Sequence, residues 1–152
     1  MDANAVDSRR YKVEAAFLYH FFNYITWPGY ESPDALKGGT ICIYGEDGVT
    51  RYLSYIQRKM AQSKRLTIDT LAPGDALDGC HMLFLRGTNP PANTPARTLT
   101  VVETQGSAGL NGMIKLLHNG EHINMSIDND LLAAHNFSVS SRLMALAKGG
   151  KQ

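Results

Sequence analysis

The sequence predicts one α/β domain: a doubly wound, mostly parallel sheet with an antiparallel C-terminal hairpin at its edge and helices on both faces. Two observations support this fold class. Short apolar segments rich in β-branched residues alternate with helical segments, which is the order found in parallel βαβ units. Near the C-terminus, two apolar segments flank Asn119 and Gly120, and Asn-Gly is the preferred pair of a type I′ hairpin turn.

The first expected element is a helix that Asp7 or Ser8 can cap and that Pro28 ends. In its central segment "VEAAFLYHFFNYITWP" (residues 13–28), the apolar side chains cover an arc of about 200°. A surface helix needs an apolar stripe of only about 100°. We therefore expect this helix to be covered on more than one side.

Two explanations for this cover stay open. The more general one is a second element of the same chain, since tertiary packing stabilises most helices in proteins. The functional one is a subunit or partner surface, with a self-contact through Tyr11, Leu18 and Phe22.

The middle of the chain alternates between strands and a helix. Apolar, β-rich segments predict strands at residues 40–45, 66–71, 80–85 and 99–104. The segment "VTRYLSYIQRKMA" follows the first strand and predicts a helix, whose apolar face carries Leu53, Ile56 and Met60. The link at residues 86–98 contains three prolines, so this crossover is expected to be irregular.

The end of the chain changes character. Beyond the hairpin, the sequence predicts helical turns, with Asn136 as a left-handed stop and Ser140 as the cap of the next turn. The last helix is the candidate to cover the far side of the first one. We expect a single domain over residues 8–148, with flexible ends at residues 1–7 and 149–152.

The composition excludes several functional classes. The chain has 152 residues, with 15 Lys and Arg against 14 Asp and Glu, and a formal net charge of +1. This balance provides no basic field of the kind that holds nucleic acid. No apolar run reaches the roughly 20 residues of a membrane-spanning helix. The polar N-terminus does not look like a signal peptide.

The common catalytic and cofactor-binding signatures are missing from the sequence. There is no GxGxxG or GxxxxGK[ST] segment, so the glycine turns that cradle dinucleotides and phosphates are absent. A GxSxG segment, which would carry a nucleophilic serine, is also absent. We therefore predict no catalytic residue, no cofactor site and no enzyme activity.

Two pairs of polar residues are candidate metal ligands. Glu46 and Asp47 follow the first strand, near the expected topological switch point, and could bind Mg²⁺ there. A solvated turn that caps the next helix is the favoured interpretation. His118 and His122 could approach each other across the hairpin turn, but zinc requires three or four fixed ligands. No metal site is predicted.

The two cysteines, Cys42 and Cys80, lie in the first and third predicted strands. In a doubly wound sheet these strands are neighbours, so the two Cα atoms could fall within the roughly 4.4–6.8 Å that a disulfide requires. Two buried free thiols in a cytosolic protein are the alternative. The geometry favours the disulfide, which needs an oxidising compartment.

Four motifs resemble the YfiR-like periplasmic regulator family. The segment "VEAAFLYHFFNYITWP" resembles its opening helix, "GTICIYGED" its first strand and "LDGCHMLFL" its third strand. The segment "GMIKLLHNGEHINMSIDNDLLAAHNFSVSSRLMALA" resembles its closing hairpin and helix. The motifs run in order over residues 13–147. Glu14 departs from the pattern because the family usually has Lys at that position.

The resemblance implies a function and a set of partners. Members are similar to periplasmic, non-enzymatic proteins that bind and repress an inner-membrane diguanylate cyclase through its periplasmic domain. They thereby control cyclic-di-GMP signalling and biofilm formation. The implied further partners are a second copy in a homodimer and an OmpA-like outer-membrane lipoprotein; no nucleic acid and no cofactor are implied.

The resemblance also implies a signal peptide that is removed, and a disulfide between Cys42 and Cys80, in agreement with the strand argument. One alternative function stays open beside this one. The chain could be a small-ligand sensor domain of an envelope signalling system, with its pocket beside Glu46 and Asp47.

Overall fold

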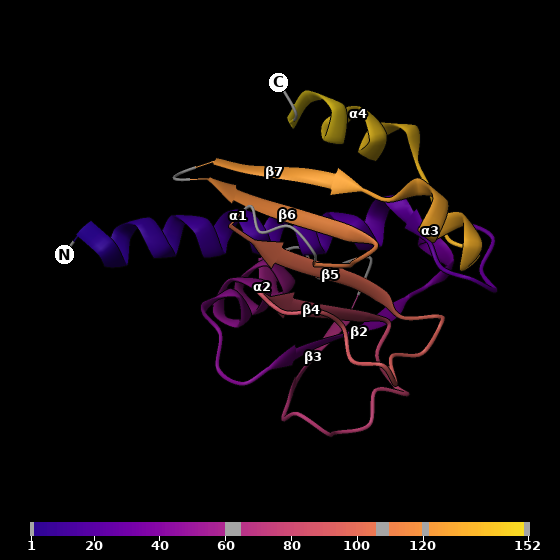
Figure 1. Ribbon diagram of the computed structural model, residues 1–152, viewed down its shortest axis with the longest axis horizontal. Coiled ribbons are helices and arrows are strands. Elements are labelled where there is room, and N and C mark those ends of the chain that lie inside the picture. The colour runs from indigo at the N-terminus through magenta and orange to yellow at the C-terminus, as the bar shows by residue number, and fades with distance from the viewer. Residues whose placement is uncertain (1, 60–64, 106–109, 120–121, 151–152) are drawn as a thin grey trace.

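The centre of the molecule is a six-stranded sheet of order β3-β2-β4-β5-β6-β7 (Figure 1). The computed structural model describes residues 2–59, 65–105, 110–119 and 122–150. The strands are β2 (Gly38–Tyr44), β3 (Arg65–Leu71), β4 (Met82–Arg86), β5 (Leu99–Thr104), β6 (Ile114–Asn119) and β7 (His122–Ile127). The first five pair in parallel, and β7 pairs antiparallel with β6 at the edge. The predicted fold class is confirmed.

The strand order places a topological switch point between β2 and β4. Counted within this sheet alone, the first strand lies between the second and the third, as in flavodoxin-like doubly wound folds. The predicted adjacency of the first and third strands is confirmed, with Cys42 opposite Leu83. In such sheets the crevice outside the carboxyl ends of the strands is where ligands bind.

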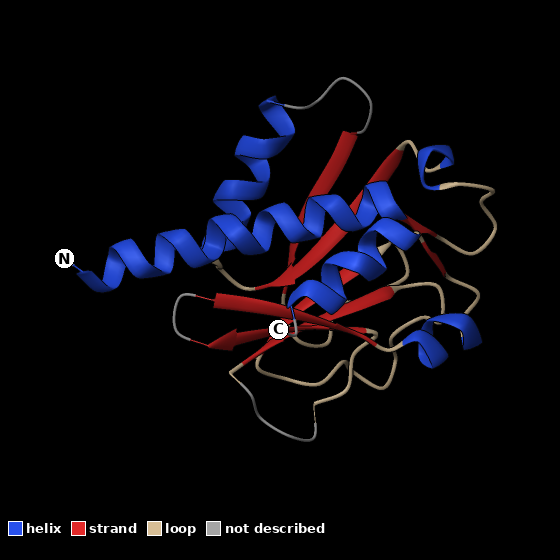
Figure 2. Cartoon of the chain, turned by 90° about the horizontal axis from the view of Figure 1, so that it is seen from above, coloured by secondary structure: helices blue, strands red, loops and turns tan. Residues whose placement is uncertain are grey.

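Helices pack around the sheet. They are α1 (Asp2–Tyr24), α2 (Gly48–Lys59), α3 (Asn129–Ala134), α4 (Ser141–Gly150) and the short 3-10 helix η1 (Pro33–Ala35). The two longest helices, α1 and α2, lie side by side on one face (Figure 2). The other face carries a smaller apolar cluster, closed by loop residues such as Leu77 and Leu110. Within the described chain, none of these helices has the length and apolar character needed to cross a membrane.

The first helix differs from the predicted one at both ends. It begins at Asp2, before the predicted caps, because the segment contains no Gly or Pro that would disfavour a helix. It ends at Tyr24 and not at Pro28, because the next two residues form β1 (Ile25–Thr26). This short strand pairs antiparallel with β8 (Ser138–Val139) and ties the end of α1 to the C-terminal segment.

Other elements of the same chain cover α1, so the more general explanation for its wide apolar arc is confirmed. α2 packs along it, and α4 also contacts it. Leu18 and Phe22 are 0% and 1% exposed, and the Phe22 ring stacks on Trp27 with centroids 4.9 Å apart. These two side chains offer no surface to a second copy. Of the expected self-contact, only Tyr11 stays partly accessible.

The hairpin and the irregular crossover lie where the sequence placed them. Asn119 pairs with His122 at the end of the hairpin, although Gly120 of the predicted turn lies outside the described residues. The link between β4 and β5 forms turns and no helix, as expected from its prolines.

The predicted caps and the apolar face of α2 also agree with the structure. Asn136 has a φ of +66°, the left-handed conformation that stops α3. The Ser140 hydroxyl accepts a hydrogen bond of 3.3 Å from the Leu143 N–H and caps α4. Leu53 is buried and Ile56 partly buried against the core, whereas Met60 of the predicted face lies outside the described residues.

A disulfide joins Cys42 in β2 to Cys80 just before β4, with Cα atoms 5.8 Å apart. It lies in the smaller apolar cluster, among Leu83 and Val102 on the loop-covered face of the sheet. The two sulfurs therefore link the two strands that border the topological switch point, and neither cysteine is left as a free thiol.

Removing this bond should lower stability strongly. Closing a sequence separation of 38 residues is worth about 4 kcal/mol in the chain-entropy model, which corresponds to a melting temperature lower by roughly 10 °C. Thermal unfolding of the oxidised protein, the reduced protein and a Cys42→Ala/Cys80→Ala variant measures the effect. Equal midpoints for the oxidised and reduced protein would contradict it.

Candidate functional site

Charged side chains from four elements meet at the carboxyl ends of the strands, beside the topological switch point. Arg86 is the last residue of β4, and Glu103 is the fifth residue of β5. Asp47 lies in the turn that leads from β2 into α2. Glu14 reaches the same point from α1. We call these four residues the Arg86 cluster.

The guanidinium of Arg86 forms paired hydrogen bonds with two carboxylates. Its Nη1 and Nη2 donate to Glu14 at 3.0 and 2.8 Å. Its Nε and Nη2 donate to Asp47 at 2.8 and 2.9 Å. The Oε2 atom of Glu103 lies 3.6 Å from Nη1. All three guanidinium nitrogens are thus engaged within the protein.

Burial makes these contacts necessary. Glu14 is 0% exposed and Glu103 is 4% exposed. A buried carboxylate without a partner is costly, and a bidentate arginine is the geometry that best compensates it. The rings of Tyr11 and Phe84 lie 5.2 and 5.1 Å from the guanidinium carbon, within cation–π range.

The Tyr11 ring can approach Arg86 because residue 48 is a glycine. A Cβ atom at Gly48 would overlap the Tyr11 ring. The first residue of α2 therefore admits an aromatic side chain from α1, and this close approach helps to hold the two helices together above the cluster.

Asp47 accepts hydrogen bonds from both α2 and β4. Its Oδ1 accepts a hydrogen bond of 2.9 Å from the Val49 N–H at the start of α2. The predicted capping role of this turn is confirmed, but Asp47 is half-buried and not solvated. Burial by itself would raise the pKa of Asp47, but the hydrogen bonds from Arg86 and Val49 outweigh it and lower that pKa below its usual value.

The pKa of Glu103 is shifted in the direction opposite to that of Asp47. Burial raises its pKa, the attraction of Arg86 opposes the rise, and the negative charge of Glu14 adds to it. The pKa of Arg86 is raised in spite of its burial, because Asp47 and Glu14 both stabilise the cation. The environment of Glu103 consequently favours a proton, whereas that of Asp47 favours the charged form.

The chemistry open to this cluster is structural. Arg86 is held by carboxylates on all its nitrogens, so it presents no free cation to an anionic substrate at the switch point. The cluster joins α1, the β2–α2 turn, β4 and β5, and acts as an ionic clamp among them.

A shallow hollow of about 420 Å³ borders the cluster at the position that the sequence proposed for a pocket. Glu46, Asp47, Thr50 and Arg51 are among the residues that line it. The carboxylate of Asp47 faces Arg86 and the start of α2, which leaves Glu46 as the other acidic group of the hollow.

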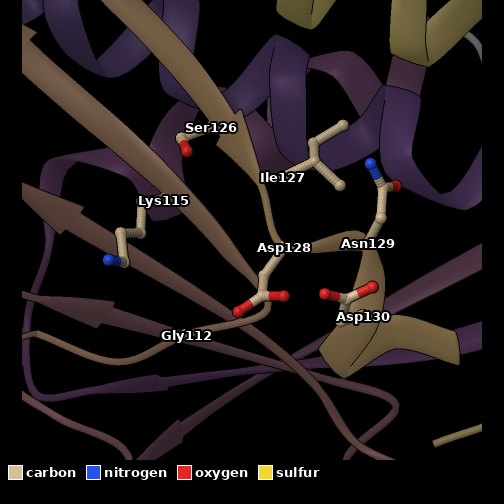
Figure 3. Close-up of a pocket in the computed structure, with 7 residues that line it drawn as sticks. All are labelled: Gly112, Lys115, Ser126, Ile127, Asp128, Asn129 and Asp130. Carbon is tan, nitrogen blue, oxygen red and sulfur yellow. The ribbon is translucent and has the colours of Figure 1, made fainter. Parts of the chain in front are cut away.

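A second hollow, of about 470 Å³, lies between the open end of the β6–β7 hairpin, away from its turn, and the start of α3 (Figure 3). Asp128 and Asp130 line it together with Lys115. The Oδ1 atom of Asp128 accepts a hydrogen bond of 3.0 Å from the Leu131 N–H, so this carboxylate caps α3. Within the described chain, no group of three or more His, Cys, Asp or Glu residues could hold a metal ion.

At the opposite ends of the strands, His81 ties β4 to the rest of the core. Its Nδ1 accepts a hydrogen bond of 3.0 Å from the Thr40 N–H, and its carbonyl accepts one of 2.8 Å from the Trp27 indole. Burial lowers the pKa of His81, in agreement with an acceptor role for Nδ1.

The sequence reasoning named Asp47 but missed its three partners in the cluster. The signals were present as lone charges in apolar segments: Glu14 in the first helix, Arg86 at the end of "MLFLR" and Glu103 in "LTVVET". Charges in such positions require partners when the segment is buried. Their mutual pairing could not be read from the sequence, because 72 residues separate Glu14 from Arg86.

Comparison with protein-family models relates the chain to a known family. A protein-family model described as YfiR/HmsC-like matches residues 11–148. The matched region includes both cysteines of the disulfide and all four residues of the Arg86 cluster. No curated protein matches the chain.

Replacing Arg86 should destabilise the fold far more than replacing Glu103. Arg86→Met leaves Glu14 buried without a counter-charge, which costs about 3–5 kcal/mol of unfolding free energy. Glu103→Gln should change stability by less than about 1 kcal/mol at pH 7, because its contact with Arg86 is long and its burial already disfavours the charge. Urea unfolding of both variants measures the difference; equal losses would refute the clamp.

The free energy of unfolding should decrease as the pH falls, and His81 should cause part of this decrease. Its pKa is lower in the folded state than the usual 6.5, so the unfolded state binds more protons as the pH falls. The stabilisation is therefore complete above about pH 6.5 and is lost as the pH falls through the folded-state pKa. His81→Asn offers a hydrogen-bond acceptor that does not titrate. Urea unfolding at pH 7 and pH 5 should show a smaller loss for this variant; parallel losses would contradict the assignment.

Proposed function

Because the chain belongs to the YfiR/HmsC-like family of periplasmic regulators of diguanylate cyclases, we propose that it binds and represses an inner-membrane diguanylate cyclase. The observation that carries this proposal is the family match over residues 11–148. The regulator acts from the periplasm on the periplasmic domain of the enzyme and has no enzyme activity of its own. Its output is a lower level of cyclic-di-GMP and, through it, less biofilm.

Features of the structure support a binding role in the periplasm. The disulfide between Cys42 and Cys80 fits an oxidising compartment. The Arg86 cluster occupies the position where doubly wound sheets bind ligands. Its guanidinium is paired with carboxylates of the same chain. That crevice is thus built as a brace, which favours a rigid binding protein over an enzyme that takes anionic substrates there.

Repression follows from a difference in affinity. The regulator lowers cyclase activity only if it binds the inactive arrangement of the enzyme more tightly than the active one. A preference of about 1.4 kcal/mol shifts the equilibrium between the two arrangements tenfold. A rigid regulator, braced by the clamp and the disulfide, loses little of this preference to its own rearrangement.

The homodimer and the OmpA-like outer-membrane lipoprotein are part of the same proposal. A lipoprotein that competes with the cyclase for the regulator would relieve repression by mass action. A dimer would present two copies of the binding surface to the cyclase and raise the effective concentration of the second contact.

A second candidate function is a small-ligand sensor domain. The hollow of about 420 Å³ beside Glu46 and Asp47 favours it, since that hollow lies close to the switch point. A thermal-shift screen against metabolites tests this candidate, because a ligand that binds the native state raises the melting temperature. A screen without any stabilising compound would weigh against it.

Repression should depend on the compartment. Co-expression of the chain, exported to the periplasm, with a membrane-anchored diguanylate cyclase is expected to lower cellular cyclic-di-GMP and to allow copurification of the two proteins. The same chain retained in the cytosol is the control, and it should leave the level unchanged. A cyclase that lacks its periplasmic domain should not respond. Unchanged cyclic-di-GMP with no copurification would refute the proposed function.

A further inference from the structure

A groove lined by cations and tyrosines lies between α1 and α2. It has a volume of about 640 Å³ and is lined by Lys12, Arg51, Tyr52, Tyr55, Ile56 and Arg58. We call it the α1–α2 groove. The two helices that form it lie side by side (Figure 2) and are joined beneath it by the approach of Tyr11 to Gly48.

The charge of the groove is one-sided. Three of its six lining residues are cations, none is acidic, and Lys59 adds a fourth cation beside them. The sequence of α2, "GVTRYLSYIQRK", contains no Asp or Glu at all. The whole chain has a formal net charge of only +1, so this local excess is a property of the groove and not of the molecule.

These cations contribute little to the stability of the fold. Lys12 lies over the ring of Tyr52 at 5.7 Å from its centroid, and Lys59 over Tyr55 at 5.5 Å. Such exposed cation–π contacts add little to stability. Within the described part of the chain, neither lysine nor Arg51 forms an ion pair with a carboxylate. Lys59 and Arg58 also complement the dipole at the end of α2, whereas Arg51 and Lys12 do not.

The aromatic part of the groove is exposed without a structural reason. Tyr55 is 49% exposed, although α2 already anchors itself to the core through Val49 and Leu53, both fully buried. Tyrosine and arginine are the residue types that most often carry the binding energy of protein interfaces. A concave site lined by tyrosines and cations has the composition of such an interface.

We propose that the α1–α2 groove is the docking site for an acidic segment of a partner protein, which places an apolar or aromatic side chain against Tyr55 and its carboxylates against Arg51 and Arg58. The identity of the partner rests on the proposed function, under which it is the periplasmic domain of the cyclase. The groove is concave and small, which fits one protein segment better than a flat anionic membrane. A nucleic acid would require a more extended basic surface than the chain offers.

The charge of the groove can be reversed with a matched control. Arg51→Glu/Arg58→Glu removes the groove cations, and Arg97→Glu/Arg142→Glu makes the same change in net charge at exposed arginines elsewhere. All four positions are exposed, so both variants should fold, with a slightly lower melting temperature where Glu replaces Arg58 at the end of α2. The aromatic contribution is tested by Tyr55→Ala, with Tyr30→Ala as the control at a comparably exposed tyrosine.

The first measurement is binding of a short fluorescent peptide of Glu and Phe, compared with the same peptide carrying Gln for Glu. The wild type and both control variants should bind the acidic peptide, with a Kd that rises with salt. The groove variants should bind it at least about tenfold more weakly. Equal binding by groove and control variants overturns the proposal. Binding to phosphatidylglycerol vesicles with no binding to the acidic peptide overturns it as well.

The second measurement is repression of the membrane cyclase in cells, as in the compartment experiment. Loss of repression in Arg51→Glu/Arg58→Glu, with repression intact in Arg97→Glu/Arg142→Glu, supports the groove as the cyclase contact. Equal repression by both variants overturns the groove while the proposed function stands. If the wild type does not repress, the proposed function fails, and the peptide titration alone decides whether the groove takes acidic segments.

Discussion

The fold depends on neutralising a carboxylate that is fully buried in its first helix. Glu14 is 0% exposed, and its charge is compensated by the two hydrogen bonds from Arg86. Since an unpaired buried charge costs several kcal/mol, α1 can occupy its place only when β4 presents Arg86 beneath it. Asp47 accepts hydrogen bonds from the Nε edge of the same guanidinium and also caps the start of α2. One cation therefore sets the relative positions of both long helices and the sheet.

A second constraint acts on the other face of the sheet. The disulfide between Cys42 and Cys80 links β2 to the start of β4, the same two strands that border the Arg86 cluster. Ionic and covalent braces thus hold the switch point from opposite sides. In the crevice that many doubly wound proteins use for a ligand, the Arg86 cluster is present here, with a shallow hollow beside it. The exposed chemistry lies instead in the α1–α2 groove, whose shape depends on the same braces, because Tyr11 packs between Arg86 and Gly48.

Local sequence signals identified nearly all of the fold and little of the site. Strands and helices follow from periodicity and turn residues, which act over a few neighbouring positions, so most strands, the edge hairpin and the caps at Asn136 and Ser140 could be predicted. The boundary of α1 was missed because pairing of β1 with β8 ends it, and that contact spans most of the chain. Leu18 and Phe22 were expected at an interface because an apolar helix face does not reveal whether its own chain covers it.

The sequence by itself determined the alternating α/β order, the edge hairpin and, through strand adjacency, the proximity of its two cysteines. These depend on backbone preferences and hydrophobic periodicity, which are determined by residues close together in the sequence. Only the tertiary structure decided which charges meet. Glu14 and Arg86 are 72 residues apart, and Asp47 and Arg86 are 39 apart, so their pairing depends on how the helices dock. The α1–α2 groove has the same origin, because a concave surface between two helices exists only after they pack.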